Sequence, residues 1–292
     1  MKVVIAGGSG FLGSALSRLL TAEGHSPVVL SRTRPPIWAP DGTAGAWARE
    51  LEGAGAVVNL AGESIEARRW SATQKERLRL SRILATRSLT TAIRGLRQPP
   101  AVFISASAVG YYGDRGEEAL TEASSPGSDF LARLCQEWEA EANAIGSITR
   151  VVLLRTGIVL DRHQGALAKM LLPFRLFAGG PVGSGRQYMS WIHRDDHARL
   201  VLWAISQEGA RGPLNGTAPA PVTNAEFAKA LGRAMNRPSV LPAPAFALRL
   251  ALGEMADALL LGSQRALPVR ASDLGFQFRY GNIDEALADI LK

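Results

Sequence analysis

The sequence predicts an α/β fold in which helices cover both faces of a parallel sheet. Short continuous apolar runs alternate with helical patterns through the first half of the chain, as expected for strands that are buried on both faces. A glycine-rich turn joins the first strand to the first helix. After residue 165 the alternation weakens, which indicates a smaller carboxy-terminal lobe on the substrate side.

The composition is typical of a globular protein that folds without disulfides. With 292 residues, 47% of them hydrophobic, the chain can bury a substantial core. The single cysteine, Cys135, excludes an intrachain disulfide. Neither a signal peptide nor an apolar run of membrane-spanning length is present. We therefore expect a cytoplasmic protein with no membrane partner.

The formal charge of +7 comes from arginines that are scattered among acidic residues. No zinc-finger spacing or RNA-binding aromatic signature accompanies them. We therefore expect no nucleic-acid partner, and we interpret the charge as an attraction for an anionic cofactor.

The elements follow from apolar runs and capping patterns. Buried strands are predicted at 2–6, 27–32, 56–62, 99–107, 150–160 and 188–193. Helices are predicted from the leucine spacing that ends at Gly24, and after the capping residues Ser71, Asp129, Thr223 and Asn282. We predict a nucleotide-binding domain at 1–165, to which part of 188–220 returns, and a smaller lobe at 166–292.

The turn after the first strand carries Gly7, Gly10 and Gly13 in the spacing GxxGxxG. Gly7 would permit the turn, Gly10 would let the backbone approach a pyrophosphate, and Gly13 would let the helix pack closely on the strand. The phosphates would then lie at the helix N-terminus. A tight turn without a ligand is the alternative, but the strand–glycine–helix context favours a Rossmann-type dinucleotide site.

The end of the second strand selects between NAD and NADP. An acidic residue there would bind the ribose 2′-hydroxyl, whereas this chain has Ser31 and Arg32. The Arg32 guanidinium can pair with a 2′-phosphate, so we predict NADP (NADPH) as the cofactor. The alternative is an arginine that is merely solvated.

Several longer stretches carry a family resemblance. They include GGSGFLG (7–13), VNLAGE (58–63), SASAVGYYGDRGE (105–117), WIHRDD (191–196) and LPVRASDLGFQFRYGNIDEAL (267–287). The sequence resembles the extended short-chain dehydrogenase/reductases, and within them an atypical subgroup of NAD(P)-dependent epimerases. Its carboxy-terminal segment, about 243–290, is similar to the domain of unknown function in that subgroup. The resemblance implies an epimerase or oxidoreductase acting on a small molecule such as a nucleotide sugar, and a homodimer.

The resemblance also implies roles for individual residues. It assigns the glycine loop residues Gly7, Ser9, Gly10, Phe11, Leu12 and Gly13 to the pyrophosphate, and Ser31 and Arg32 to the adenosine end. It assigns Leu60, Ala61, Gly62, Glu63, Arg82, Ser105 and Val159 to the ribose, phosphate and nicotinamide parts of the cofactor. For Arg82, a surface position on its helix is the alternative.

Catalysis in such proteins uses a serine and a YxxxK pair on the next helix. Ser107 is the expected serine, with Ser105 as the alternative. The next helix reads DFLARLCQEWE and lacks the tyrosine and the lysine. Tyr111 is our candidate for the missing acid/base, although packing under the loop is a simpler role for it. Cys135 lies on the apolar stripe of its helix, which favours an inert thiol.

The HRDDH stretch (193–197) has two histidines four residues apart but lacks the glutamate of HExxH. We expect no metal there. Two functions therefore stay open: an NADP-dependent enzyme with altered acid/base chemistry, and a cofactor-binding sensor or scaffold with little turnover, with a link to cell division.

Overall fold

The computed structural model describes residues 1–292 and divides into two compact units. Unit 1 comprises Met1–Ala108, Arg133–Arg155 and Ala198–Leu214. Unit 2 comprises Val109–Ala132, Thr156–His197 and Asn215–Lys292. The chain passes between the two units several times, so neither is a single continuous segment.

A six-stranded parallel sheet forms the centre of unit 1, in the order β10-β6-β4-β3-β1-β2. Its strands are β1 (Lys2–Ala6), β2 (Ser26–Leu30), β3 (Ala56–Asn59), β4 (Val102–Ala108), β6 (Arg150–Thr156) and β10 (Gly212–Gly216). Because β1 pairs in parallel with both β2 and β3, the strand order reverses there. Ligands of doubly wound sheets bind at the carboxyl ends of the strands at such a reversal. The predicted Rossmann-type fold is confirmed.

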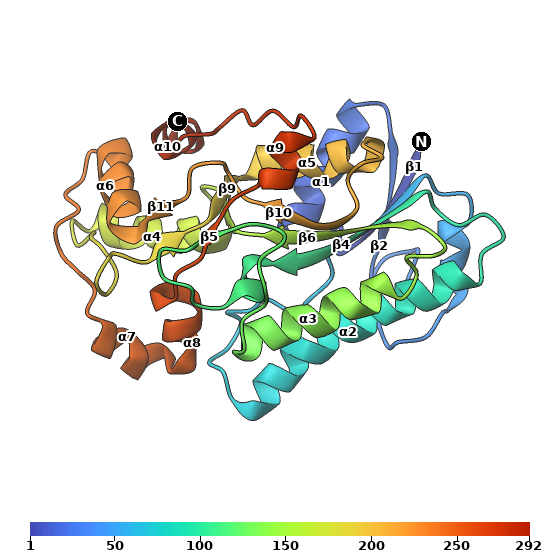
Figure 1. Cartoon of the computed structure of the whole chain (residues 1–292), viewed down its shortest axis with the longest axis horizontal. Coiled ribbons are helices and arrows are strands. Elements are labelled where there is room, and N and C mark those ends of the chain that lie inside the picture. The colour runs from blue at the N-terminus through green and yellow to red at the C-terminus, as the bar shows by residue number, and fades with distance from the viewer. The chain divides into compact units, whose positions relative to one another are not determined.

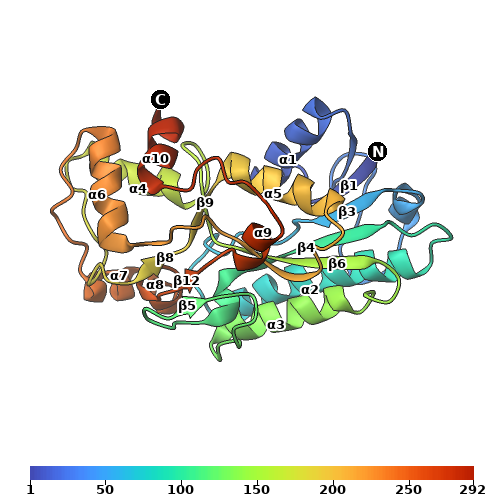
Figure 2. The same cartoon turned by 45° about the horizontal axis from the view of Figure 1, so that its top comes forward.

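Helices cover both faces of this sheet. Figure 1 shows α1 (Phe11–Ala22) and α5 (Arg194–Ser206) on one face, and α2 (Ala72–Arg94) and α3 (Phe130–Asn143) on the other. Figure 2 shows the same two layers after rotation. The inner strands are continuous apolar runs because both of their faces are buried, as Val3 and Val4 on adjacent positions illustrate. A 3₁₀ turn at Ala46–Leu51 (η1) adds Trp47 and Leu51 to the core.

Two of the predicted strands are wrong in their extent. The run 150–160 divides at Gly157 into β6 and β7 (Ile158–Leu160), and the run 188–193 divides at Ser190 into β8 (Tyr188–Met189) and β9 (Trp191–His193). The halves pair with different partners: β6 belongs to the main sheet, whereas β7 pairs with β9 and β8 with β11 (Val222–Thr223). A Cβ at Gly157 would lie 2.4 Å from the Ser190 carbonyl oxygen, so a side chain has no room at this division.

Unit 2 combines short strands with small helices. Its further elements are β5 (Ala119–Leu120), β12 (Arg265–Ala266), α4 (Gly165–Arg175), α6 (Asn224–Met235), α7 (Ala245–Leu252), α8 (Glu254–Ala256), α9 (Val269–Asp273), α10 (Ile283–Leu291), a 3₁₀ turn η2 (Val109–Tyr112) and a π turn η3 (Asp257–Leu261). Its larger core packs α4, α6 and α10 around Trp191, Phe227 and Leu287. No helix of the structure combines the length and the apolar character that crossing a membrane requires.

The predicted helix starts are confirmed by their side-chain caps. The Ser71 hydroxyl accepts from the Gln74 backbone N–H at 3.1 Å, and the Asp129 carboxylate accepts from the Ala132 N–H at 2.9 Å. Thr223 and Glu226 form the complete reciprocal capping box. These signals are local, so the sequence carries them without knowledge of the tertiary fold.

Candidate cofactor site and active site

The glycine turn after β1 is too crowded for side chains at two positions. Gly7 has φ +78°, and a Cβ there would lie 2.7 Å from the carbonyl carbon of Leu60 at the end of β3. A Cβ at Gly13 would lie 2.4 Å from the Gly7 carbonyl oxygen. The Gly10 N–H donates to the same oxygen at 3.0 Å. The glycines therefore bring the α1 N-terminus directly against the ends of two neighbouring strands.

The N-terminus of α1 has the properties of an anion site. Gly10 is the N-cap, no side chain caps the helix, and no acidic residue lies in its first turn. The adjoining Ser9 and Gly10 are exposed. Uncapped N–H groups and the positive end of the helix dipole favour a phosphate. The backbone of residues 7–13 thus fits a pyrophosphate group.

The turn after β2 presents basic side chains to solvent. The Ser31 hydroxyl accepts from the backbone N–H groups of Thr33 (3.2 Å) and Arg34 (3.1 Å), which holds the turn. Arg32 and Arg34 are both exposed, and the turn from 31 to 34 contains no acid. Arg34 is a second candidate for a phosphate contact that the sequence analysis did not single out, although the repeated arginine in SRTR was the available signal.

Hydrogen bonds from side chains of α2 fix the conformation of the loop after β3. The Ala61 N–H donates to the buried Asn59 side chain at 3.1 Å, and the Glu63 N–H donates to the Ser81 hydroxyl at 3.0 Å. The Gln74 side chain, which donates to the Glu63 carboxylate, lowers the pKa of Glu63, and Arg77 lowers it further. The four residues from Leu60 to Glu63 therefore have a defined conformation next to the glycine turn.

Arg82, also on α2, stabilises the same loop after β3. Its guanidinium donates to the carbonyl oxygens of Glu63 and Leu78, both at 3.0 Å, and lies 5.4 Å from the ring of Trp138. These contacts bind Arg82 to the loop after β3. A direct contact of Arg82 with the cofactor stays a prediction.

The two serines of β4 differ in their partners. Ser105 is fully buried, and its hydroxyl lies 3.4 Å from the carbonyl oxygen of Ala106. The Ser107 hydroxyl donates to Glu139 Oε1 at 2.7 Å. Arg155 donates to both oxygens of the same carboxylate, from Nε and from Nη2, each at 2.8 Å. Ser107, Glu139 and Arg155 are all buried and form one charge-assisted network between β4, α3 and β6.

The sequence alone did not indicate Glu139 and Arg155 as residues of the site. A signal for Arg155 was present, because a lone arginine inside an apolar strand must meet an acid when the strand is buried. Nothing local indicated which acid that would be.

The positions of the absent YxxxK pair lie on α3. Cys135 Sγ is 3.8 Å from the carbonyl oxygen of Ala108 at the end of β4. Burial raises the pKa of the Cys135 thiol to about 11. Near neutral pH the thiol is therefore protonated, and it is not a ready nucleophile.

Comparison with known families identifies the chain. Residues 3–215 match the NAD dependent epimerase/dehydratase family, and residues 243–290 match a domain of unknown function, DUF1731. The chain belongs to the NAD dependent epimerase/dehydratase family. An epimerase family protein of Mycobacterium leprae is 46% identical over 98% of this chain and 94% of its own length.

Solved structures agree with this family assignment. The crystal structure of the human epimerase family protein SDR39U1 with NADPH is 38% identical, covers 100% of this chain and 99% of the human chain, and has a TM-score of 0.93. A UDP-N-acetylglucosamine 4-epimerase from Bacillus cereus is 19% identical, covers 100% of this chain and 98% of its own, and has a TM-score of 0.76. At that identity the second likeness shows the fold alone.

Two further candidate residues, Tyr111 and Val159, lie in unit 2. Tyr112 is fully buried, and its hydroxyl donates to Asn215 Oδ1 at 2.7 Å. Tyr111 is half-buried and meets the Tyr112 ring edge-on, with centroids 5.4 Å apart. Val159 lies in β7 beside Ile192. The roles of Tyr111 in proton transfer and of Val159 at the nicotinamide stay predictions.

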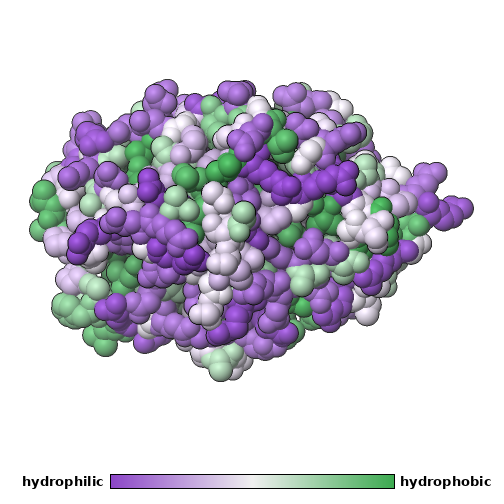
Figure 3. Space-filling view, viewed as in Figure 1, coloured by the Kyte–Doolittle hydropathy of each residue, from purple (hydrophilic) through white to green (hydrophobic).

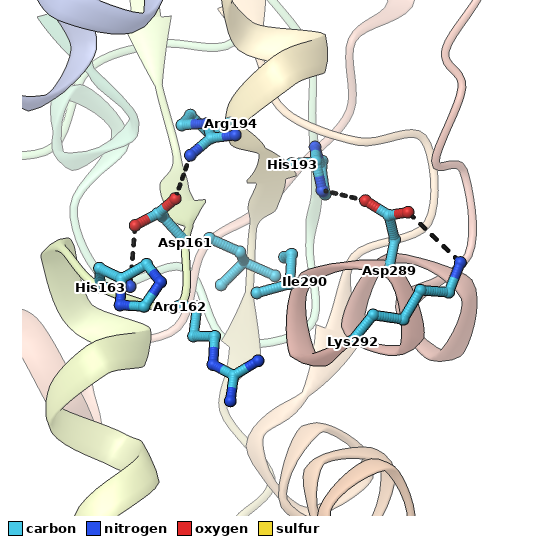
Figure 4. A pocket seen from close by; sticks show the side chains of 9 residues that line it. Asp161, Arg162, His163, His193, Arg194, Asp289, Ile290 and Lys292 are labelled. Atoms are coloured by element: carbon cyan, nitrogen blue, oxygen red, sulfur yellow. Dashed lines mark hydrogen bonds and ion pairs between the residues drawn. The ribbon is translucent and has the colours of Figure 1, made fainter.

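The two histidines of the HRDDH stretch, His193 and His197, are both buried in unit 2. His193 lies beside a cavity of about 290 Å³ (Figure 4). Its Nδ1 accepts from the Asp195 N–H, so Nε2 carries the ring proton, 3.5 Å from Asp289. Burial lowers the pKa of both histidines, that of His197 to about 4. No group of three His, Cys, Asp or Glu side chains is placed to hold a metal ion.

Proposed function

We propose that this chain binds NADP(H) through the glycine turn and the turn after β2. The observation that carries the proposal is the uncapped N-terminus of α1, which glycines without room for a Cβ hold against the ends of β1 and β3. The exposed Arg32 and Arg34 supply positive charge where the 2′-phosphate of NADP would lie. The human relative solved with NADPH supports the same choice of cofactor.

Replacing Arg32 with alanine should weaken NADPH binding by roughly 10- to 100-fold and leave NADH binding nearly unchanged. The reason is the loss of a charge-assisted contact to a phosphate that NADH lacks. Fluorescence titration of both reduced cofactors measures the two affinities. The exposed Arg49, on η1, provides the matched control as Arg49→Ala. An equal loss for NADPH and NADH would remove Arg32 from the 2′-phosphate site.

We also propose that the protein is an oxidoreductase or epimerase acting on a small molecule with a hydroxyl group, such as a nucleotide sugar. Bound NADP would supply the acceptor for a hydride from the substrate carbon. The chain must then handle the proton of the attached oxygen. Since the Ser107 hydroxyl donates a hydrogen bond to Glu139, its lone pairs remain to accept a hydrogen bond from a substrate hydroxyl. As the hydride leaves the substrate carbon, the hydroxyl proton would pass to Ser107 Oγ while the Ser107 proton passes to the Glu139 carboxylate. Arg155 would act as a positioning residue for Glu139.

Ser107→Ala should leave NADPH affinity within about twofold of wild type and abolish any turnover that a substrate screen detects. General acid–base groups contribute on the order of 10²- to 10⁴-fold to rates, so the effect should exceed assay error. The measurement is NADPH oxidation or NADP reduction against carbonyl compounds and nucleotide sugars. Ser105→Ala tests the neighbouring serine of the same strand. Turnover that survives in Ser107→Ala would exclude this hydroxyl from the reaction.

A second function, cofactor sensing without turnover, is favoured by one observation. The helix that should carry the tyrosine and the lysine has Leu131 and a buried, protonated Cys135 in one register of that spacing. The proton-transfer group is therefore not evident in α3. Tight NADPH binding together with no turnover across the screen would favour this function over the first.

A further inference from the structure

An open hollow of about 640 Å³ lies at the end of α6 in unit 2. No acidic residue lines it, whereas Lys229, Arg233 and Arg237 do. It shares no residue with the glycine turn or with the Ser107 network, which belong to unit 1. The proposed cofactor site and active site therefore leave this basic hollow unexplained.

The chain turns back tightly after α6. Asn236 ends the helix with φ +52°, and the N–H groups of Asn236 and Arg237 donate to the carbonyl oxygens of Arg233 (3.1 Å) and Gly232 (2.9 Å). A Cβ at Gly232 would lie 2.8 Å from the Arg237 carbonyl oxygen and 3.0 Å from Ser239 Cβ. The residues that follow the helix are therefore packed against its last turn, which fixes their position beside the hollow.

The Arg237 guanidinium is held in place without a carboxylate. Its Nη1 donates to the Asn236 carbonyl oxygen at 3.0 Å, and its Cζ lies 4.6 Å from the centroid of the Phe177 ring. Phe177 has φ +57°, a backbone conformation that is costly for a bulky side chain and often accompanies a functional site. The buried Nε of Arg237 has no hydrogen-bond acceptor. The fold thus orients a positive charge whose hydrogen-bonding capacity is only partly used.

The basic residues of the hollow are not all balanced by acids. Arg233 is paired with Asp284 of α10 at 2.6 Å. Lys229 is exposed and makes no ion pair, and Glu226, one turn before it, is held in the capping box of α6. Basic residues can also balance the negative end of a helix, but backbone N–H groups already bond the last carbonyl oxygens here. Lys229 and Arg237 therefore leave positive charge uncompensated.

Polar and apolar groups lie next to these charges. The side chains of Asn236 and Ser239 line the hollow and make no hydrogen bond within the chain. Val240, which also lines it, is 74% exposed, and Phe177 is 59% exposed. Figure 3 shows hydrophobic residues at the left edge of this view, where Figure 1 places the chain between α6 and α7. These surroundings fit a ligand that has an anionic head and an apolar part.

We propose that the hollow at the end of α6 binds the phosphate monoester group of a small molecule or of a lipid. Such a group carries a charge of about −1.5 to −2 at neutral pH and three strong acceptor oxygens. Lys229 and Arg237 would pair with these oxygens, and the Ser239 hydroxyl would donate to one of them. The apolar part of the ligand would pack on Val240 and on the exposed part of the Phe177 ring.

Amide NMR of the ¹⁵N-labelled full chain, titrated with phenyl phosphate, tests the proposal. The resonances of Asn236, Ser239 and Val240 should shift in a saturable manner with a Kd of roughly 0.1–1 mM. Inorganic phosphate should shift the same resonances but bind at least about fivefold more weakly, because it lacks the ring that packs on the apolar wall.

The Lys229→Met/Arg237→Met double variant should weaken phenyl phosphate binding at these resonances at least about tenfold. It removes both uncompensated charges but keeps unbranched side chains that can pack on Phe177. Shifts of residues 8–13 would report phosphate at the glycine turn and should be the same as in wild type. The matched control, Arg18→Met/Arg49→Met, removes two exposed arginines outside the hollow and should keep the wild-type affinity.

Two results would overturn the proposal. One is the absence of saturable shifts at Asn236, Ser239 and Val240 up to about 20 mM phenyl phosphate. The other is an unchanged affinity at these resonances in the Lys229→Met/Arg237→Met variant, because binding would then not depend on the charges of the hollow.

Cosedimentation with phosphatidylcholine vesicles that contain about 20% phosphatidic acid distinguishes the two sources of the phosphate group. If wild type pellets with them and the Lys229→Met/Arg237→Met variant does not, the group belongs to a lipid, and the expected lack of a membrane partner is wrong. If wild type binds phenyl phosphate but stays in the supernatant, the group belongs to a soluble phosphate ester. Each of these outcomes supports a phosphate site in the hollow.

Discussion

Replacing Arg155 with alanine should destabilise the protein by about 3–5 kcal/mol, because it leaves the Glu139 carboxylate buried without its ionic partner. Arg155 makes two hydrogen bonds of 2.8 Å to this carboxylate, and both side chains are almost fully buried. The Ser107 hydroxyl alone could not replace this interaction. Urea denaturation followed by circular dichroism measures the free energy of unfolding.

A double variant separates loss of charge balance from loss of packing. Glu139→Gln combined with Arg155→Met removes both charges and keeps similar side-chain volumes, so it should recover more than half of the loss. The exposed pair Arg87–Glu141, which joins α2 to α3, offers a comparison, and Arg87→Ala should cost under about 1 kcal/mol. If Arg155→Ala also cost under about 1 kcal/mol, the Ser107–Glu139–Arg155 network would not be a main support of β4, α3 and β6.

Gly13→Ala should weaken NADPH binding by at least about 100-fold, which corresponds to the loss of one or two charge-assisted hydrogen bonds to the pyrophosphate. The added methyl group would lie 2.4 Å from the Gly7 carbonyl oxygen and 2.5 Å from the Gly8 Cα. Both obstacles are backbone atoms, so α1 must move away from the turn, and its N–H groups would no longer meet the phosphates. Fluorescence titration with NADPH measures the affinity.

Gly24→Ala is the matched control at the other end of α1. Gly24 has φ +73°, so alanine there should cost stability, but no atom lies within 4 Å of the added Cβ. NADPH affinity should therefore stay at the wild-type value. Wild-type affinity in Gly13→Ala would show that close packing of α1 on the turn is not needed for binding, and would count against the proposed pyrophosphate site.

Much of the fold is predictable because its signals are local. The glycine turn, the alternation of apolar strands with helices, and the caps at Ser71 and Thr223 each depend on residues within one or two turns of chain. The match of residues 243–290 to DUF1731 agrees with the expected carboxy-terminal segment. The pairing of strands that are far apart in the chain was not predicted correctly. The apolar run 150–160 looks uniform in sequence, yet its two halves pair in different sheets on either side of Gly157.

In the candidate active site, too, the sequence predicts local features but not contacts between distant segments. The sequence could nominate Ser107, but not its partner, because Glu139 lies 32 residues away on a helix that only the folded sheet brings against β4. The contacts of Arg82 with Glu63 and Leu78 likewise depend on how α2 lies against the loop after β3.

From the sequence alone came a dinucleotide-type turn, basic residues after the second strand and the absence of a tyrosine–lysine pair, since each is a property of consecutive residues. Only the tertiary structure showed that the Ser107 hydroxyl donates a hydrogen bond to an ion-paired glutamate. It alone also showed that α7 has no buried residue. The physical reason is that burial and hydrogen-bond pairing depend on which segments the fold brings together, and the spacing of residues along the chain does not encode this.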